Sequence, residues 1–231
     1  MIRLLIVDDD PLVRSGLRLL FTGAPDIEVV AEAADGSEVL ALVREHAPHV
    51  VLMDIRMPTM DGLTATTLLR NGRTVPGDMR PGGVPPDLAV PEIVMLTTFH
   101  SDEYVVRALR AGAAGFLLKD TPPREIVEAV RRVAAGDPAL SPTVIHQLIT
   151  AVTADADTND KRRTARERLA LLGDREREVA AAVGRGRTNV ETAAELFISV
   201  PTVKAHVSSI LTKLDLNNRV QIAILIHDAE G

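Results

Sequence analysis

The sequence RLLIVDDD at residues 3–10 is the clearest indication of the fold. Four consecutive apolar residues bounded by charges are typical of a short strand buried within a sheet. Comparable runs lie at residues 27–33, 49–54, 92–97 and 115–118, and apolar residues at helical spacing separate them. Strands that alternate with helices need right-handed crossovers, so we predict an α/β fold with a doubly wound, five-stranded parallel sheet.

Composition limits the classes of protein to which the chain can belong. Its 231 residues are 46% hydrophobic and 25% charged, which is typical of globular domains and leaves room for two of them. The absence of cysteine excludes disulfides, thiolate metal sites and cysteine nucleophiles. An aromatic content of 2% disfavours stacking platforms for single-stranded nucleic acid. No apolar run reaches the ~18 residues of a membrane span, so we expect a cytoplasmic protein without a membrane partner.

The charge is distributed unevenly along the chain. Residues 1–160 carry a net charge of −9 and residues 161–231 carry +3, which suggests that the two parts have different partners. We assign residues 1–136 to the sheet domain and residues 165–231, where the pattern is helical throughout, to a small all-α domain. Residues 137–164 would hold a helix and a flexible linker.

Breaker and polar residues mark the irregular segments. Residues 71–91 contain five Pro and four Gly, so we predict a long exposed loop there. Residues 143–152 have a helical pattern. Residues 153–163 are polar and lack periodicity, which is typical of an interdomain linker.

Charged or hydroxyl side chains lie at the carboxyl ends of four predicted strands. Asp8 and Asp9 follow the first strand, Asp54 ends the third, Thr97 ends the fourth, and Lys119 follows the fifth. The carboxyl ends of strands in a doubly wound sheet meet at one crevice, so these side chains should converge. Neighbouring carboxylates repel each other unless a cation lies between them, and a hard divalent ion, Mg²⁺ most naturally, prefers oxygen ligands. Asp54 could then act as a carboxylate nucleophile toward a phosphoryl group.

A simpler reading of the same residues is structural. Asp residues that follow strands are common in turns and at helix N-termini. We favour this role for Asp10, which precedes Pro11 and can cap the first helix. Lone Lys and Thr residues need no special role, so the hypothesis for Lys119 and Thr97 depends on the whole pattern.

The sheet domain resembles the receiver domains of bacterial response regulators, which have a flavodoxin-like fold. The resemblance covers residues 1–136 apart from the long loop, and the interval from Asp54 to Thr97 is about a dozen residues longer than usual. It is carried by LLIVDD at residues 4–9, MDIRMPTMDG at residues 53–62, LTT at residues 96–98 and GAAGFLLKD at residues 112–120.

The resemblance implies a role for each matching residue. Asp54 would accept phosphate from a sensor histidine kinase, and Lys119 would pair with the phosphoryl oxygens. Mg²⁺ would be held by the side chains of Asp9 and Asp54, by Asp8 through water, and by the Arg56 carbonyl.

Thr97 and Phe116 would form the switch pair of such a domain. A phosphoryl group adds negative charge and acceptor oxygens, so it can draw a nearby hydroxyl inward and vacate space for the aromatic ring. Plain core packing explains Phe116 nearly as well.

The C-terminal part contains a helix-turn-helix pattern. Thr188 and Glu191 form a capping box that opens a helix through Leu196, and Ser199 caps the next helix after a short connection. The second helix buries an apolar stripe of Val203, Val207, Ile210, Leu211 and Leu214, and exposes Lys204, Ala205, Ser208 and Thr212. The exposed face fits the major groove of DNA.

Residues 169–231 resemble the four-helix DNA-binding domain of the LuxR type, in motifs such as TVKAHV at residues 202–207. By this resemblance Lys204, Ala205 and Ser208 occupy base-reading positions. Basic side chains such as Lys213 and Arg219 could meet phosphates. The full set of predicted DNA contacts is Arg187, Thr188, Thr202, Lys204, Ala205, His206 and Ser208.

The sequence therefore predicts a response regulator of the NarL/FixJ type that a sensor histidine kinase phosphorylates and that binds double-stranded DNA. We expect a homodimer on activation, with RNA polymerase as a further partner. Residues 220–227 are apolar on nearly every side, which fits either a dimer surface or a tightly packed terminal helix. Two alternatives remain: a regulator that works without phosphorylation, and a haloacid-dehalogenase-type phosphatase that uses Asp8 and Asp10.

Overall fold

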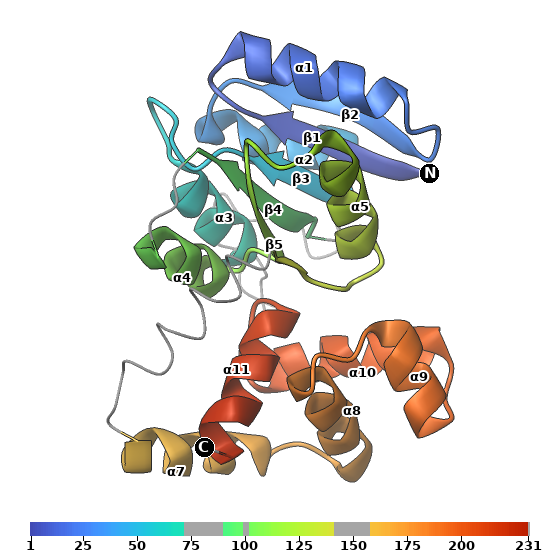
Figure 1. Ribbon diagram of the computed structural model, residues 1–231. Coiled ribbons are helices and arrows are strands. Elements are labelled where there is room, and N and C mark those ends of the chain that lie inside the picture. Colours follow the sequence, from blue (N-terminus) through green and yellow to red (C-terminus); the bar gives the residue numbers. More distant parts are fainter. Residues whose placement is uncertain (72–89, 99–101, 141–157, 231) are drawn as a thin grey trace.

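The computed structural model describes residues 1–71, 90–98, 102–140 and 158–230 (Figure 1). The predicted loop at residues 71–91 falls almost wholly outside these ranges. The helix predicted at residues 143–152 lies entirely outside them. Within the described residues, no helix is long and apolar enough to cross a membrane.

The N-terminal domain is a parallel sheet with strand order β2-β1-β3-β4-β5-β6. The five predicted strands are present to within one residue at each end, but the prediction of five strands was incomplete because a two-residue strand, β6, extends the sheet beside β5. The strands are β1 (Ile2–Val7), β2 (Ile27–Ala33), β3 (Val50–Met53), β4 (Glu92–Thr97), β5 (Gly115–Leu118) and β6 (Ala139–Leu140).

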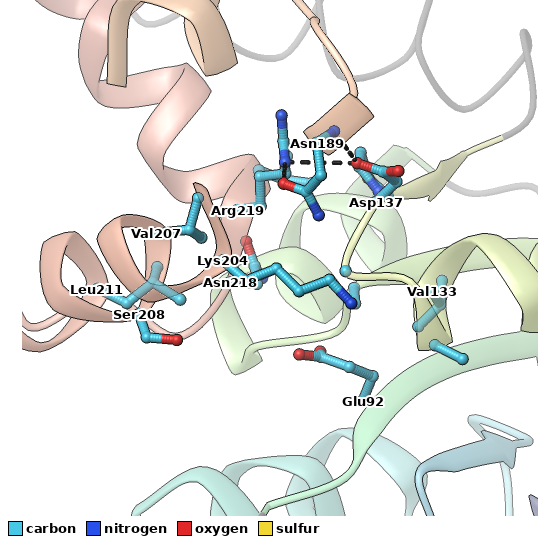
Figure 2. A pocket seen from close by; sticks show the side chains of 15 residues that line it. Glu92, Val133, Asp137, Asn189, Lys204, Val207, Ser208, Leu211, Asn218 and Arg219 are labelled. Atoms are coloured by element: carbon cyan, nitrogen blue, oxygen red, sulfur yellow. Dashed lines mark hydrogen bonds and ion pairs between the residues drawn. The ribbon is translucent and has the colours of Figure 1, made fainter. Parts of the chain in front are cut away.

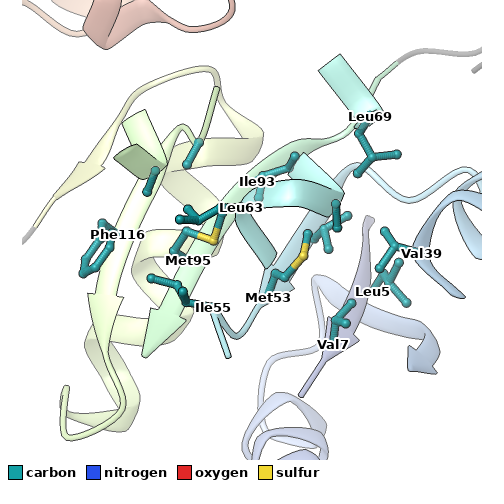
Figure 3. Packing of buried hydrophobic residues seen from close by; sticks show 14 of the residues in the cluster. Leu5, Val7, Val39, Met53, Ile55, Leu63, Leu69, Ile93, Met95 and Phe116 are labelled. Carbon is teal, nitrogen blue, oxygen red and sulfur yellow. The ribbon is translucent and has the colours of Figure 1, made fainter. Parts of the chain in front are cut away.

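Helices cover both faces of the sheet, as a doubly wound fold requires (Figure 1). On one face α1 and α5 pack against alternate strand residues such as Leu4 and Ile6. On the other face α2, α3 and α4 pack against Leu5, Val7 and Met53 (Figure 3). The helices are α1 (Pro11–Thr22), the 3-10 turn η1 (Gly36–Glu38), α2 (Val39–His46), α3 (Gly62–Asn71), α4 (Asp102–Ala111) and α5 (Pro123–Ala134).

The start of α1 confirms the capping role predicted for Asp10. Its carboxylate accepts a hydrogen bond from the Leu12 N–H at 2.8 Å. Pro11 occupies the first turn, where a helix can spare an N–H donor. Asp10 therefore serves as the N-cap of α1 and lies outside the acidic cluster described below.

The C-terminal domain is entirely helical over its described residues. It contains α7 (Thr158–Leu169), α8 (Asp174–Gly184), α9 (Asn189–Leu196), α10 (Val200–Lys213) and α11 (Arg219–Glu230). The prediction of a linker through residue 163 was wrong in part, since α7 already begins at Thr158. The charged sequence of α7 hides its helical pattern because few of its residues are buried. Ala165, however, joins the core against α11.

The helix-turn-helix prediction is confirmed in its local geometry. The Thr188 hydroxyl accepts from the Glu191 N–H, and the Glu191 carboxylate accepts from the Thr188 N–H. Phe197 ends α9 in the left-handed region (φ 55°), and Ser199 caps α10. Val203, Ile210 and Leu214 are buried as predicted, whereas Val207 and Leu211 are half-buried and face the space between the domains.

Helix α11 packs against helices of both domains. Ile222 and Leu225 join the core of the C-terminal domain with α7 and α8, whereas Val220 and Ile224 contact the sheet domain. Contacts on several sides explain why the helix is apolar nearly all round. The packing favours a buried terminal helix over a dimer surface in this arrangement.

Candidate functional site

Three strand ends bring charged side chains together as the sequence predicts. Asp8 directly follows β1, Asp54 follows β3 and Lys119 follows β5. The Lys119 ammonium lies 2.6 Å from an Asp8 carboxylate oxygen and 2.8 Å from an Asp54 oxygen. Asp8 and Asp54 are buried, so their charges interact through little solvent.

The cluster has the composition of a site for a hard cation. Carboxylate oxygens of Asp8, Asp9 and Asp54 all lie within 4.8 Å of one another, with Asp9 on the exposed side. Three carboxylates face a single ammonium, so the site keeps an excess of negative charge. Oxygen donors with uncompensated charge suit Mg²⁺. The residues present therefore fit a magnesium ion.

The protonation equilibria reflect this crowding. Burial raises the pKa of Asp8 above its usual range, and the contact with Lys119 offsets this only in part. Burial alone would lower the pKa of Lys119, but its hydrogen bonds to Asp54 and Asp8 outweigh burial and raise that pKa. Lys119 is therefore firmly cationic at neutral pH.

Backbone contacts fix the orientation of Asp54. One carboxylate oxygen accepts from the Ile55 N–H at 2.7 Å, and the other accepts from Lys119. The backbone of Gly62 lies against that of Asp54, so a Cβ on Gly62 would be 2.1 Å from the Asp54 carbonyl oxygen. Only glycine allows this approach of the loop to α3.

The predicted switch residues lie next to this cluster. Thr97 and Phe116 are fully buried near the ends of β4 and β5, and the Thr97 carbonyl accepts from the Lys119 N–H at 2.8 Å. Phe116 packs within the core on the α4 face. Arg56 follows Asp54 by two residues, and its guanidinium lies 5.7 Å from the ring centre of Tyr104 on α4. The loop after Asp54 thus contacts α4.

Asp35 supports the site and was missed from the sequence. Its carboxylate accepts from the backbone N–H groups of Thr59 (2.8 Å) and Met60 (3.2 Å), so it holds the loop between β3 and α3. An aspartate after β2 looks like any turn residue. Nothing in the local sequence links it to a loop 24 residues away.

The predicted DNA-reading side chains lie on α10, with mixed accessibility. Thr202, Lys204, Ala205 and Ser208 are exposed, and His206 is half-buried. Lys204 and Ser208 nevertheless line a cavity of about 240 Å³ between the two domains, with Glu92 of the sheet domain on its other side (Figure 2). The sheet domain thus covers this part of α10.

Other residues predicted to contact DNA have partners within the protein. Arg187 pairs with Glu195 at 3.3 Å, and Thr188 acts as the cap of α9. Lys213 pairs with Glu176 at 2.8 Å, and Arg219 is only 8% exposed. Lys213 and Arg219 are thus engaged within the protein in this arrangement, and their contact with phosphates stays a prediction.

Glu176 anchors α10 to α8. Its carboxylate accepts from Lys213 and from the Ser209 hydroxyl on α10, and from the Gly173 N–H. Lys213 first, and then Ser209 and Gly173, lower the pKa of Glu176 to about 2. The carboxylate thus stays ionised and holds α10 at any physiological pH.

Polar side chains at the start of α11 hold the two domains together. The Asn218 side-chain amide donates to the carbonyls of Leu109 (2.8 Å) and Ala113 (2.9 Å) at the end of α4. Gln221 donates to the same Leu109 carbonyl at 2.9 Å. These contacts add hydrogen bonds to carbonyls in the last turn of α4 and just after it. The sequence could not reveal them because the partners lie more than a hundred residues apart.

Comparisons with known proteins identify a family for each of the two domains. A model of the response regulator receiver domain matches residues 4–131, and a model of bacterial regulatory proteins of the luxR family matches residues 170–226. The transcriptional regulatory protein LiaR of Bacillus subtilis is 36% identical over 227 residues, covering 98% of this chain and 97% of LiaR. The response regulator protein VraR of Staphylococcus aureus is 34% identical, covering 96% and 95% of the two chains.

Solved structures give the same result. The crystal structure of response regulator ChrA, from a heme-sensing two-component system, matches with a TM-score of 0.50 and 34% identity, covering 99% of this chain and 98% of ChrA. A LuxR-family response regulator from Aurantimonas matches with a TM-score of 0.55 and 33% identity, over 64% of this chain and 96% of its own. The chain belongs to the two-component response regulators that join a receiver domain to a LuxR-type helix-turn-helix domain and control transcription.

Proposed function

We propose that Asp54 accepts a phosphoryl group from a sensor histidine kinase and that this modification controls DNA binding by the C-terminal domain. One observation carries the proposal. Asp54 is a buried carboxylate at a strand end, held by Lys119 and flanked by Asp8 and Asp9. This arrangement supplies a nucleophile, a fixed cation and a cation site in one place.

The proposed transfer takes place between Asp54 and a phosphohistidine of the kinase. An Asp54 carboxylate oxygen attacks the phosphorus of a phosphohistidine, the P–N bond breaks, and the histidine nitrogen leaves with the bonding electrons. Lys119 stands beside the new acyl phosphate and balances part of its added charge. Asp8, Asp9, Asp54 and the Arg56 carbonyl would hold Mg²⁺, which when bound neutralises the charge of the phosphoryl oxygens.

The signal would travel to α4 through buried neighbours. The Thr97 hydroxyl moves toward the phosphoryl oxygens, and Phe116 fills the space that it vacates. Phe116 packs against the α4 side of the core, and the end of α4 is where Asn218 and Gln221 are bound. A shift of α4 would thus weaken the contacts that hold α11.

The output is release of the DNA-reading face. Lys204 and Ser208 face the receiver domain across the cavity, so they can read bases only after the domains separate. A shift from mostly closed to mostly open needs about 5.5 kcal/mol of differential stabilisation, so phosphorylation and dimerisation together would supply it. The released domains would bind DNA as a homodimer and act on RNA polymerase. The proposed contact set remains Arg187, Thr188, Thr202, Lys204, Ala205, His206 and Ser208.

Phosphorylation should therefore increase DNA affinity. We expect acetyl phosphate with Mg²⁺ to tighten binding of the full-length protein by about 5- to 150-fold, the usual range of coupling between two sites. Duplexes selected from a random-sequence pool serve as the DNA, and fluorescence anisotropy gives the dissociation constant. Equal affinity before and after complete phosphorylation would instead support a regulator that works without phosphorylation.

A further inference from the structure

A second contact between the domains is built around a carboxylate of the receiver domain. Asp137 lies in the loop between α5 and β6. One of its oxygens accepts from the backbone N–H of Asn189 at 2.9 Å and lies 3.4 Å from the Arg219 guanidinium (Figure 2). Both partners belong to the DNA-binding domain.

The groups that hold this carboxylate form an anion site. Asn189 is the first residue of α9, so its N–H is one of the donors that the helix leaves free and lies at the positive end of the helix dipole. Arg219 is buried and cationic, and a buried guanidinium requires an anionic partner. It is held in place by the Asn189 side-chain oxygen at 2.6 Å and by the Arg187 carbonyl. A positioned N–H and a fixed guanidinium remain on the DNA-binding domain when Asp137 leaves.

The same site borders the DNA-reading face. The cavity that Lys204 and Ser208 line is also lined by Asp137, Asn189 and Arg219. A Cβ placed on Gly136, the neighbour of Asp137, would lie 4.0 Å from a carbon atom near the end of the Lys204 side chain. An anion at this site therefore sits beside the residues that would enter the major groove. Helix N-termini and arginines are common ligands of DNA backbone phosphates.

We infer that the Asp137 carboxylate occupies the position of a DNA backbone phosphate, so that the receiver domain and DNA compete for one anion site. The inference rests on the proposed function and adds to it the Asn189 N–H as a phosphate donor and Asp137 as the competing anion, neither of which the sequence patterns assigned. Competition at one site is reciprocal: DNA weakens the closed arrangement as much as the closed arrangement weakens DNA binding. Asp137 thus acts as an internal substitute for the ligand.

The test removes the carboxylate from the full-length protein. Asp137→Ala, without phosphorylation, should bind a fluorescein-labelled random-sequence duplex about 5- to 150-fold more tightly than the wild type. Selective ¹⁵N labelling of asparagine gives an NMR spectrum with few backbone amide signals, because the chain has five asparagines. Adding the duplex to Asp137→Ala should shift the backbone amide signal of Asn189. The comparison is between the spectra of Asp137→Ala with and without the duplex. Loss of the Asp137 contact is common to both spectra and therefore does not produce this shift.

Glu28→Ala is the matched control. It likewise removes one carboxylate from the receiver domain, but an exposed one on β2, at the opposite edge of the sheet. It should leave affinity near that of the wild type. If Asp137→Ala gains no affinity beyond this control, or binds DNA without shifting the Asn189 amide, the inference is wrong and the proposed function stands. If phosphorylated wild type and Asp137→Ala both fail to bind DNA, both are wrong.

Discussion

Replacing Asp54 with asparagine is expected to abolish covalent labelling by acetyl phosphate and, with it, the gain in DNA affinity. The amide lacks the anionic oxygen that attacks phosphorus. It keeps the size of the side chain and can still accept from the Ile55 N–H, while Lys119 keeps its contact with Asp8. The variant should therefore fold. Intact-mass spectrometry after incubation with acetyl phosphate and Mg²⁺ measures the labelling.

Asp10→Asn is the matched control for this experiment. It changes an aspartate that caps α1 and lies outside the cluster, and Asn is an equally good cap. Labelling should remain at the wild-type level, whereas chelation of Mg²⁺ by EDTA should prevent it in both proteins. Label that persists on Asp8 in Asp54→Asn would contradict the account and favour the phosphatase alternative.

Replacing Lys119 with methionine should lower the free energy of unfolding by about 3 kcal/mol in metal-free buffer, because it leaves two buried carboxylates facing each other without a cation. Added Mg²⁺ should restore much of the loss by taking the place of the ammonium. Because burial raises the pKa of Asp8, its protonation at lower pH should also reduce the deficit. Urea denaturation with EDTA, with Mg²⁺ and at several pH values measures these effects.

Lys204→Met provides the comparison, since Lys204 is exposed. Its unfolding free energy should stay within about 0.5 kcal/mol of the wild type in either buffer. A similarly small effect of Lys119→Met, or a loss that Mg²⁺ does not reduce, would show that the carboxylates do not depend on a shared cation.

Local signals made much of the fold predictable from the sequence. The strands of the receiver domain are short apolar runs, and each alternates its side chains between two helix layers, as Leu4 and Leu5 do. The caps at Asp10, Thr188 and Ser199 depend on neighbours within three residues. The convergence of Asp8, Asp54 and Lys119 followed from topology alone, because parallel strands end at one edge.

The remaining features depend on contacts that no local pattern encodes. Strand β6 has only two residues and exists through pairing with β5. The role of Asn218 depends on carbonyls at the end of α4, and that of Arg219 depends on Asp137. Arg219 looks like a phosphate ligand in sequence, whereas in the structure it is buried and faces Asp137 of the other domain.

Under the proposed function, phosphorylation of Asp54 separates the DNA-binding domain from the receiver domain. Because the chain has no cysteine, Leu19→Cys on α1 and Leu171→Cys between α7 and α8 can carry a single pair of spin labels. These side chains are 74% and 65% exposed, so the labels should not disturb packing. Pulsed electron–electron double resonance should give one narrow distance distribution without phosphorylation. Acetyl phosphate and Mg²⁺ should add a second, broader population in the wild type, and this population should be absent in Asp54→Asn. An unchanged distribution in fully phosphorylated protein would contradict the account.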